Sequence, residues 1–489
     1  LIDNGYNFSN THHYHSNTTT AAGHAALSTG YIPINNGIVA NNVYNRATQK
    51  WEYSVLDTTA VFEGIDTTYL KKVSYENLKK PSLGDIIKRY DSLSKSYSVS
   101  LKDRASIALG GRNANRAFWF DASSTQMVST THYKEPFFNW VKEFRANKVL
   151  ANDLMNGWQL SDGFTPDAFT AEDFIEQETG IFSPSFPHTL ATLDSAKVPV
   201  EKEGVFIWHT PFGDKYVLEF GKKLIAEENL GADEHTDVLT LSLSSADLIG
   251  HHFGPNSYEV QDYYLKLDRY LGDFLSFLDE KVGKDNYILA LSGDHGVAQF
   301  PQLAAKEGKD AQRISKKVFD RDFEVVDSLV RLELGLTKSV IKEVSYKGLE
   351  PDIAVLDEIG IDSFTLFKTL EKYIKEIPYI LEVYHPFDID NEKCTKPFIN
   401  EVRNSFDIQR NTLLYLLQKE NYLVDARPHG TTHGTPFWYD THVPLLFYGV
   451  GIQVGQSTDR VHTIDVAPTL LHLSGVEPYD KFDGKIILN

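Results

Sequence analysis

At 489 residues the chain is long enough for an extensive hydrophobic core, either as one large α/β domain with insertions or as a few domains. Hydrophobic residues make up 42% and charged residues 24%, a balance typical of a globular and not a disordered protein. The net charge of −19 argues against a general binder of nucleic acid or anionic membranes, because polyanions would be repelled on average. The one cysteine, Cys394, excludes an intrachain disulfide and a cysteine-rich zinc site, and no apolar run reaches the length of a membrane span.

The start of the sequence reads as the middle of a fold. Leu1 is not preceded by a charged-then-apolar leader, and LIDNGYNF is typical of the end of a helix followed by a turn. We therefore expect any signal peptide to lie outside this sequence. The next residues include His12, His13 and His15 at irregular spacing in a polar segment. This pattern predicts an exposed, non-specific binder, and we place these histidines outside any specific site.

Hydroxyl side chains precede an Ala-rich segment in NTTTAAGHAALSTG (17–30), which predicts a helix ending near Gly30. A hydroxyl at a helix N-terminus lies beside free backbone N–H groups and the positive end of the dipole, which favours an incoming phosphate. The alternative is simple N-capping by any one of Thr18, Thr19 and Thr20.

A predicted strand at 96–101 leads into two basic residues. Its apolar residues alternate from Tyr97 to Leu101, so Lys102 and Arg104 fall together on the opposite face. A point charge and a planar guanidinium can together hold the oxygens of a phosphate dianion. The alternative, which this motif alone supports equally well, is that Lys102 and Arg104 lie on a solvent-exposed strand edge and bind no ligand.

Strands and helices alternate along the chain, which predicts a mostly parallel sheet covered by helices on both faces. The segment 263–282 has apolar residues at helical spacing and predicts a crossover helix, and 463–475 predicts a short helix closed by Gly475. The clearest strand candidates are 96–101, 205–208, 237–244, 286–292 and 443–448.

Two stretches interrupt this alternation. The segment 299–425 is rich in charges, contains predicted helices at 362–374 and 409–420, and is interpreted as an inserted cap subdomain. The segment 112–200, with aromatic clusters, is a second candidate insertion.

Carboxylate and imidazole groups follow two of the strand candidates. Asp247 and His251 are four residues apart, so a helical turn would direct both to one side, although a capping Asp beside an unrelated surface His is common. Asp294 and His295 lie in SGDHG directly after the strand at 286–292, and burying two ionisable groups there is costly unless they are paired or bind a metal. These ligand types suit a Zn²⁺-type ion, and strand ends are where α/β folds place their active sites.

A third candidate ligand precedes the strand at 443–448. His433 lies in HGTTHGT, with His429 beside it. Either could be a ligand, and a solvated turn is the alternative.

Read together, these motifs resemble the alkaline phosphatase superfamily. The closest likeness is to bacterial periplasmic phosphomonoesterases with a threonine nucleophile, neighbours of the nucleotide pyrophosphatases/phosphodiesterases. The resemblance assigns the nucleophile of T-A-A-G-H to Thr20 and a phosphate-holding asparagine in GIVANN to Asn41. Lys102 and Arg104 become the phosphate contacts of the monoesterase branch, and His429 becomes a bystander.

The resemblance also implies two Zn²⁺ ions. One would be held by Asp247, His251 and His433. The other would be held by Asp294, His295, the Thr20 oxygen and an aspartate that the family places upstream of Leu1. As the sequence stands, we expect the second ion to be short of one carboxylate.

The resemblance as a whole implies one α/β catalytic domain over 1–489. Its expected fold is a three-layer sandwich with inserted cap subdomains. Its activity would be metal-dependent hydrolysis of small phosphate monoesters through a phosphothreonine intermediate. We expect a periplasmic or secreted monomer without a nucleic-acid partner or a membrane span. The alternatives are a nucleotide pyrophosphatase/phosphodiesterase on the same fold and a non-catalytic metal-binding relative.

Overall fold

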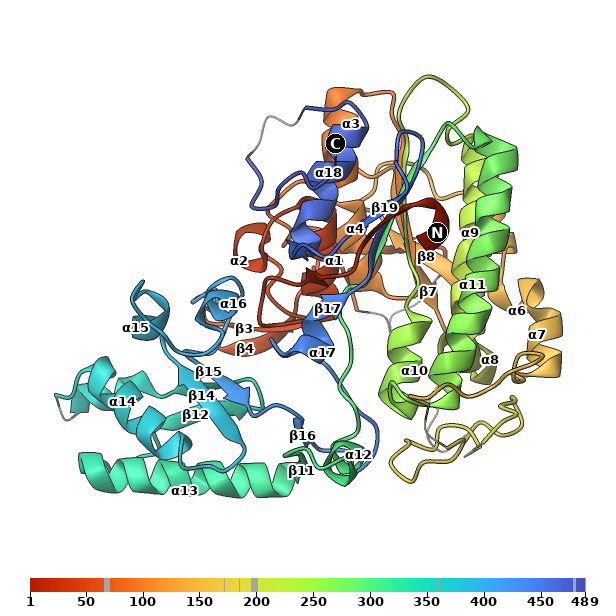
Figure 1. Cartoon of the computed structure of the whole chain (residues 1–489). Helices are drawn as coiled ribbons and strands as arrows, with labels where there is room; N and C mark the ends of the chain where they lie inside the picture. The colour runs from red at the N-terminus through yellow and green to blue at the C-terminus, as the bar shows by residue number, and fades with distance from the viewer. Residues whose placement is uncertain are drawn as a thin grey trace.

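The computed structural model describes residues 1–488 except 66–70, 171, 184, 195–200, 359 and 478–480. Two sheets form the middle of the molecule, and helices lie on both sides of them (Figure 1). The first sheet has the order β5 (Phe62–Glu63), β8 (Gln126–Thr130), β7 (Arg116–Asp121), β6 (Ser96–Ser100) and β9 (Val238–Ser242). The second has the order β10 (Ile288–Ser292), β18 (Leu445–Gly449), β1 (Tyr6–Phe8) and β19 (Gly455–Ser457).

Strand pairing in these sheets is mixed and not mostly parallel. β6 pairs in parallel with β7 and β9, and β1 with β19, whereas β8 and β18 pair antiparallel with their neighbours. The predicted strands at 96–101, 237–244, 286–292 and 443–448 are confirmed. β9 and β10 each end a sheet, so they have a strand neighbour on one side among the described residues, and most of their residues are half-buried.

Helices cover both faces of β6. α9 (Pro211–Glu228) contacts β6 and β9 and packs against α11 (Tyr258–Leu278), while α4 (Asp103–Gly110) contacts β6 and β7 and packs against α1 (Thr20–Thr29). All five residues of β6 are buried as a result. The predicted helices are therefore confirmed at 17–30, where Gly30 closes α1 at φ 74°, and at 263–282, which α11 covers up to Leu278.

The strand predicted at 205–208 is wrong, because these residues belong to helix α8 (Lys202–Trp208). Val205, Phe206 and Ile207 are buried in the same core as α9. Gly204 lets the helix closely approach Ala122, the residue after β7, since a Cβ there would be 1.7 Å from the carbonyl oxygen of Ala122. A run of four apolar residues is compatible with a strand or a helix, and the close packing at Gly204 favours the helix.

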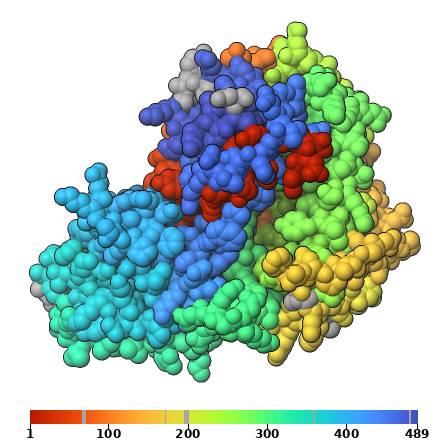
Figure 2. Space-filling model, in the orientation of Figure 1, coloured from red at the N-terminus to blue at the C-terminus, as the bar shows by residue number. Residues whose placement is uncertain are grey.

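Residues 299–425 form a lobe with its own sheet and core beside the two central sheets (Figures 1 and 2). Its sheet has the order β12 (Ile341–Ser345), β13 (Gly348–Pro351), β15 (Leu414–Gln418) and β14 (Ile380–Tyr384), covered by α13 (Lys316–Leu334) and α14 (Ser363–Ile374). The helix predicted at 362–374 is confirmed as α14. The helix predicted at 409–420 is wrong, because Leu414–Gln418 is a fully buried strand hydrogen-bonded on both sides.

The segment 112–200 does not begin as an insertion. β7 and β8 lie within it and belong to the first sheet, because β7 pairs directly with β6. The part after β8 contains the short helices α5 (Asn139–Glu143), α6 (Ala146–Val149) and α7 (Ala151–Asn156).

The smaller elements include the hairpin of β3 (Asn42–Asn45) and β4 (Lys50–Tyr53) and the C-terminal α18 (Val466–Leu473). Gly475 has φ 70° just after α18, so the short helix predicted at 463–475 is confirmed. Within the ranges that the structure describes, no helix combines the length and apolarity needed to cross a membrane.

Candidate active site

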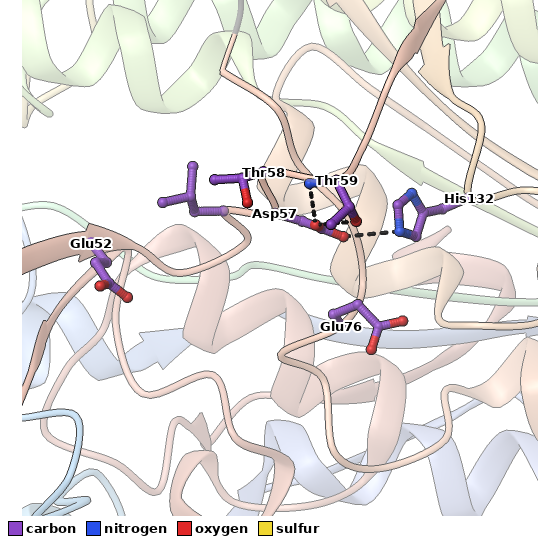
Figure 3. A pocket seen from close by; sticks show the side chains of 7 residues that line it. Glu52, Asp57, Thr58, Thr59, Glu76 and His132 are labelled. Atoms are coloured by element: carbon purple, nitrogen blue, oxygen red, sulfur yellow. Dashed lines mark hydrogen bonds and ion pairs between the residues drawn. The ribbon is translucent and has the colours of Figure 1, made fainter. Parts of the chain in front are cut away.

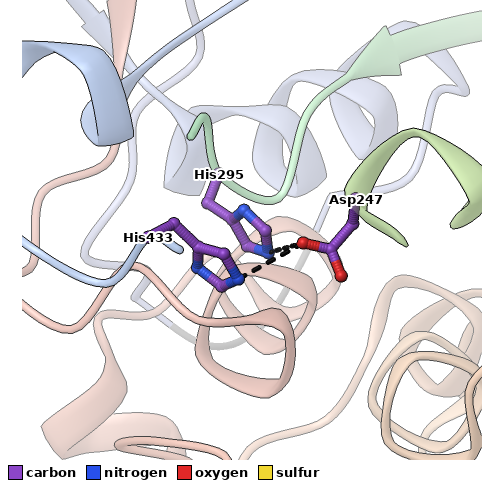
Figure 4. A group of neighbouring side chains, drawn as sticks. All are labelled: Asp247, His295 and His433. Atoms are coloured by element: carbon purple, nitrogen blue, oxygen red, sulfur yellow. Dashed lines mark ion pairs between the residues drawn. The ribbon is translucent and has the colours of Figure 1, made fainter. Parts of the chain in front are cut away.

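Three predicted metal ligands from separate segments face one another (Figure 4). The Nε2 atoms of His433 and His295 lie 3.3 Å and 3.8 Å from Oδ1 of Asp247, and the two imidazole rings stack with centroids 3.4 Å apart. The three ligand atoms are close enough together to share one cation.

The segments around these ligands explain their convergence. Asp247 and His251 lie one turn apart in α10 (Ser245–Phe253), directly after β9, and His251 Nε2 is 3.2 Å from Asp247 Oδ1. Asp294 and His295 follow β10, and His433 lies in the loop before α17 (Trp438–Thr441). The expectation that Asp247 and His251 point to one side is confirmed.

The second ring nitrogen of each histidine is bound to the backbone. Nδ1 of His251, His295 and His433 lies 2.7, 2.9 and 2.7 Å from the carbonyl oxygens of Thr431, Gly296 and Thr18. A carbonyl oxygen only accepts, so each Nδ1 donates its hydrogen and the lone pair remains on Nε2. This tautomer is the one that a metal ion needs.

The surroundings also favour the ligand forms of Asp247, Asp294 and His433. Burial alone would raise the pKa of Asp247, but Lys102 and His251 outweigh it and hold that pKa well below its usual range. Burial likewise opposes ionisation of Asp294, yet His295 and His24 lower its pKa. Burial lowers the pKa of His433 to about 4. At neutral pH the carboxyl groups are therefore ionised and His433 is neutral.

Thr20 begins α1 beside the Asp294 loop. His24, one turn later, bonds the Thr20 carbonyl oxygen through Nδ1 (2.8 Å), and the same nitrogen lies 3.2 Å from Asp294 Oδ2. A Cβ on Gly23 would be 2.1 Å from the carbonyl oxygen of Asp294, so the helix and the loop are in direct backbone contact. Sequence reasoning missed Gly23 and His24 as contributors, although both stand in the T-A-A-G-H motif.

The residues present fit a bound metal. Thr20 Oγ1, Asp247 Oδ1 and His295 Nε2 are buried atoms without a hydrogen-bond partner among the described residues. Buried polar atoms are rarely left unpaired, and here all three belong to predicted metal ligands. A set of carboxylate, imidazole and hydroxyl donors suits Zn²⁺.

The predicted phosphate-binding residues border the same atoms. Lys102 Nζ contacts Asp247 Oδ2. Arg104 is half-buried and donates from NH1 to the Tyr53 hydroxyl (3.2 Å), and its buried Nε has no partner in the described part of the chain. Asn41 Oδ1 accepts a hydrogen bond from the backbone N–H of Ala21 (2.8 Å).

The predicted route by which the two cations converge is wrong. The strand β6 ends at Ser100, Lys102 directly precedes α4, and Arg104 lies in the first turn of that helix. The helix start, and not strand alternation, therefore directs Lys102 and Arg104. Tyr53, at the end of β4, was missed by sequence reasoning because nothing in KWEY signals its contact with Arg104.

The first histidine cluster is buried and not exposed as predicted. His13 bonds through Nε2 to the carbonyl oxygen of Gly293 (3.2 Å) and through Nδ1 to the Thr463 hydroxyl (2.9 Å), and thus supports the loop that carries Asp294. His15 is fully buried. His429, in contrast, is exposed.

Two other clusters of polar side chains lie away from the predicted metal ligands, and neither is a candidate active site. Glu371, His385 and Asp388 cluster in the lobe, but Lys396 Nζ lies 2.5 and 2.6 Å from the two carboxylates and already supplies their cation. A surface hollow of about 540 Å³ contains Asp57, whose carboxylate is bonded to Thr59 and His132 (Figure 3). None of the candidate metal ligands lines this hollow.

Comparisons with known proteins show the family and the fold of this chain. Residues 1–436 match the family described as type I phosphodiesterase / nucleotide pyrophosphatase. The alkaline phosphatase PafA of Elizabethkingia meningoseptica is 33% identical over 98% of this chain and 86% of its own length, and its crystal structure superposes with a TM-score of 0.89 over 99% of this chain and 92% of that one.

Two further relatives are 29% identical. One is a Myroides odoratus protein named calcium-transporting ATPase, covering 98% of this chain, and the other is the alkaline phosphatase PhoV of Synechococcus elongatus, covering all of it; each match spans 86% of the relative. These findings confirm the predicted superfamily and fold and support a metal-dependent hydrolase of phosphoric esters. The chain belongs to the type I phosphodiesterase / nucleotide pyrophosphatase family and has the α/β fold of the alkaline phosphatase superfamily.

Proposed function

We propose that the chain is a phosphomonoesterase that works through a phosphothreonine intermediate on Thr20 with two Zn²⁺ ions. Asp247, His251 and His433 would hold one ion, and Asp294, His295 and Thr20 would contribute to the other. The main support is that the atoms Thr20 Oγ1, Asp247 Oδ1 and His295 Nε2 are all buried without a hydrogen-bond partner among the residues that the structure describes. Bound there, the ions would lower the pKa of the Thr20 hydroxyl and neutralise charge on the ester.

The residues of the chain then have separable roles. Thr20 Oγ1 loses its proton to solvent and attacks phosphorus as the bond to the leaving oxygen breaks, and the departing alkoxide takes up a proton from solvent to become the alcohol. Water then attacks phosphorus, the bond to Oγ1 breaks, and inorganic phosphate leaves with the threonine hydroxyl restored. Asn41 is held beside the N-terminus of α1 by its bond to Ala21, which suits a group that orients a phosphate oxygen.

The preference for monoesters rests on Lys102 and Arg104. A monoester dianion carries more charge on its non-bridging oxygens than a diester, so it gains more from two cations. The buried Nε of Arg104 has no hydrogen-bond partner among the described residues, which supports this role, because a phosphate oxygen would supply the missing acceptor. We also propose a periplasmic or secreted location, with which the single cysteine is compatible.

Substitution of Arg104 by alanine tests the preference. We expect kcat/KM for an aryl phosphate monoester to fall by about a hundredfold or more, the loss typical of one electrostatic contact in a transition state, and that for an aryl diester to change far less. The measurement is steady-state hydrolysis of both esters by zinc-loaded protein. Equal losses on both would favour the phosphodiesterase alternative, and no phosphate release by the metal-loaded wild type would favour a non-catalytic relative.

A further inference from the structure

The lobe formed by residues 299–425 reaches the centre of the site through one lysine. Lys347 lies in the turn between β12 and β13, and its Nζ donates hydrogen bonds to Asn17 Oδ1 (2.8 Å) and to the carbonyl oxygen of Gly434 (2.7 Å). Asn17 is three residues before Thr20, and Gly434 directly follows His433. One ammonium group from the lobe therefore joins the nucleophile segment to the segment of a metal ligand.

The close approach of Lys347 depends on Gly434. This glycine has φ 117°, and a Cβ added to it would lie 2.3 Å from Nζ of Lys347. The Gly434 N–H donates to Asp440 Oδ2 (2.9 Å), while its carbonyl oxygen accepts from Lys347. The side chains of Asp440 and Lys347 thus bind both backbone polar groups of Gly434, the residue after His433.

The turn that carries Lys347 is itself fixed. The carbonyl oxygen of Lys347 accepts from the Leu416 N–H (3.0 Å), and that of Tyr346 accepts from the Gln418 side chain. Both donors belong to β15, the buried strand of the lobe sheet. The position of Nζ is consequently set by the lobe and not by a mobile surface loop.

The lobe also supports the nucleophile segment at the backbone. The N–H of Ser16 donates to the carbonyl oxygen of Glu401 (3.0 Å), and the N–H groups of Ser16 and Asn17 lie 2.9 and 3.3 Å from the buried hydroxyl of Ser405. The segment that carries Thr20 and the segment that carries His433 are also linked directly, because the Thr18 hydroxyl donates to the carbonyl oxygen of Thr435 (2.9 Å).

We propose that Lys347 is a positioning residue that fixes His433 relative to Thr20, so that the lobe supports the catalytic centre and does not only cover it. Among the described residues, Lys347 makes no hydrogen bond or ion pair with a proposed metal-ligand side chain or phosphate-binding residue. It acts through Asn17 and Gly434. This inference rests on the proposed metal site and assigns the lobe a role in holding it together.

The test replaces Lys347 by methionine, which keeps the length of the side chain and removes both hydrogen bonds and the charge. Loss of a partner behind a metal ligand typically costs 10- to 100-fold in metal affinity or activity. We expect K347M to bind Zn²⁺ about tenfold more weakly at its weaker site, measured by competition with a chromophoric chelator. We expect kcat for an aryl phosphate to fall about tenfold or more with KM within about twofold of wild type, because Lys347 does not contact substrate.

Two further variants make the comparison decisive. K347Q retains an amide donor and should recover part of the zinc affinity and kcat. Lys342, in the same hairpin, is exposed and bonds Gln49, so K342M also removes a lysine contact of the lobe but should behave as wild type. Folding is checked by circular dichroism, and K347Q carries the test if K347M does not fold.

The proposal would be overturned if folded K347M had the zinc affinity and the kcat of the wild type. If K347M does not fold, the same result in K347Q would overturn it. The chelator titration needs no turnover. If the wild-type chain binds Zn²⁺ but releases no phosphate, the proposed function fails, while the comparison of zinc affinities still decides the role of Lys347.

Discussion

Glu178 is a buried carboxyl group with one oxygen that has no hydrogen-bond partner among the described residues. Burial, with Glu259 and Asp173 nearby, raises its pKa from 4.5 to about 9. Between pH 4.5 and 9 the folded state keeps a proton that the unfolded state releases. Unfolding is therefore increasingly favoured as the pH rises through this window, and the loss of stability levels off above the folded-state pKa.

Replacing Glu178 by glutamine removes this proton linkage. We expect the thermal midpoint of E178Q relative to wild type to rise progressively from pH 5 to pH 9, as measured by circular dichroism. Glu176 is exposed two residues away, and E176Q should show no such trend. A difference between E178Q and wild type that stays constant with pH would show that Glu178 is not a buried neutral group.

The sequence allowed prediction of the residues that converge but not of those that support them. Asp247 and His295 follow apolar strands, and strand ends in α/β proteins meet at one edge, so their proximity follows from local pattern. His13 and Lys347 give no such signal, because each lies far along the chain from the segments it contacts. His13 was predicted to be exposed for the same reason: a polar neighbourhood in sequence does not reveal that Gly293 and Thr463 enclose it.

At the level of elements, the position of α1 depends on Gly23. Alanine favours a helix interior over glycine by about 1 kcal/mol, so propensity alone predicts that Gly23→Ala would stabilise the protein. A Cβ 2.1 Å from the Asp294 carbonyl oxygen instead forces α1 and the loop after β10 apart. We expect lower thermal stability and, since misplacement by about 1 Å can cost about a hundredfold, a loss of kcat of that order.

Gly272 offers a matched control within α11, where an added Cβ would meet nothing within 4 Å. G272A should retain kcat and gain stability from helix propensity. Calorimetry and steady-state kinetics on both variants test the comparison. Wild-type kcat in G23A would mean that the contact between α1 and the Asp294 loop does not set the geometry of the site.

Element predictions succeeded where length or periodicity is distinctive and failed for short apolar runs. α11 is long and amphipathic, and the alternation of apolar residues in β6 stops where the strand ends, so both elements can be predicted from the sequence. Residues 205–208 and 409–420 do not, because an apolar run of this length fits a helix or a strand. Contacts with Ala122 in one case and with β13 and β14 in the other decide the outcome, and these partners are distant in sequence.

At the scale of the whole molecule, the proposed metal ligands join segments from opposite ends of the chain. Thr20 lies in α1, Asp247 in α10 and His433 in the loop before α17, so the complete set exists only in the folded state. A ligand that binds only the folded state stabilises it by RT ln(1 + [L]/Kd), about 2.7 kcal/mol per site at a free concentration of 100 Kd. We therefore expect the thermal midpoint to rise with free Zn²⁺ and to fall on removal of metal with EDTA.

The dependence on zinc should weaken when a ligand is removed. In Asp247→Asn the side chain keeps its size but loses the charge that pairs with buried Lys102, so the midpoint in EDTA should fall. The gain on adding Zn²⁺ should shrink by at least half if one of two ions is lost. Differential scanning calorimetry across a series of buffered zinc concentrations measures both quantities. Identical midpoints in EDTA and in excess Zn²⁺ for the wild type would show that the buried unpartnered atoms of Thr20, Asp247 and His295 do not bind the ion, because binding to the folded state cannot occur without stabilising it.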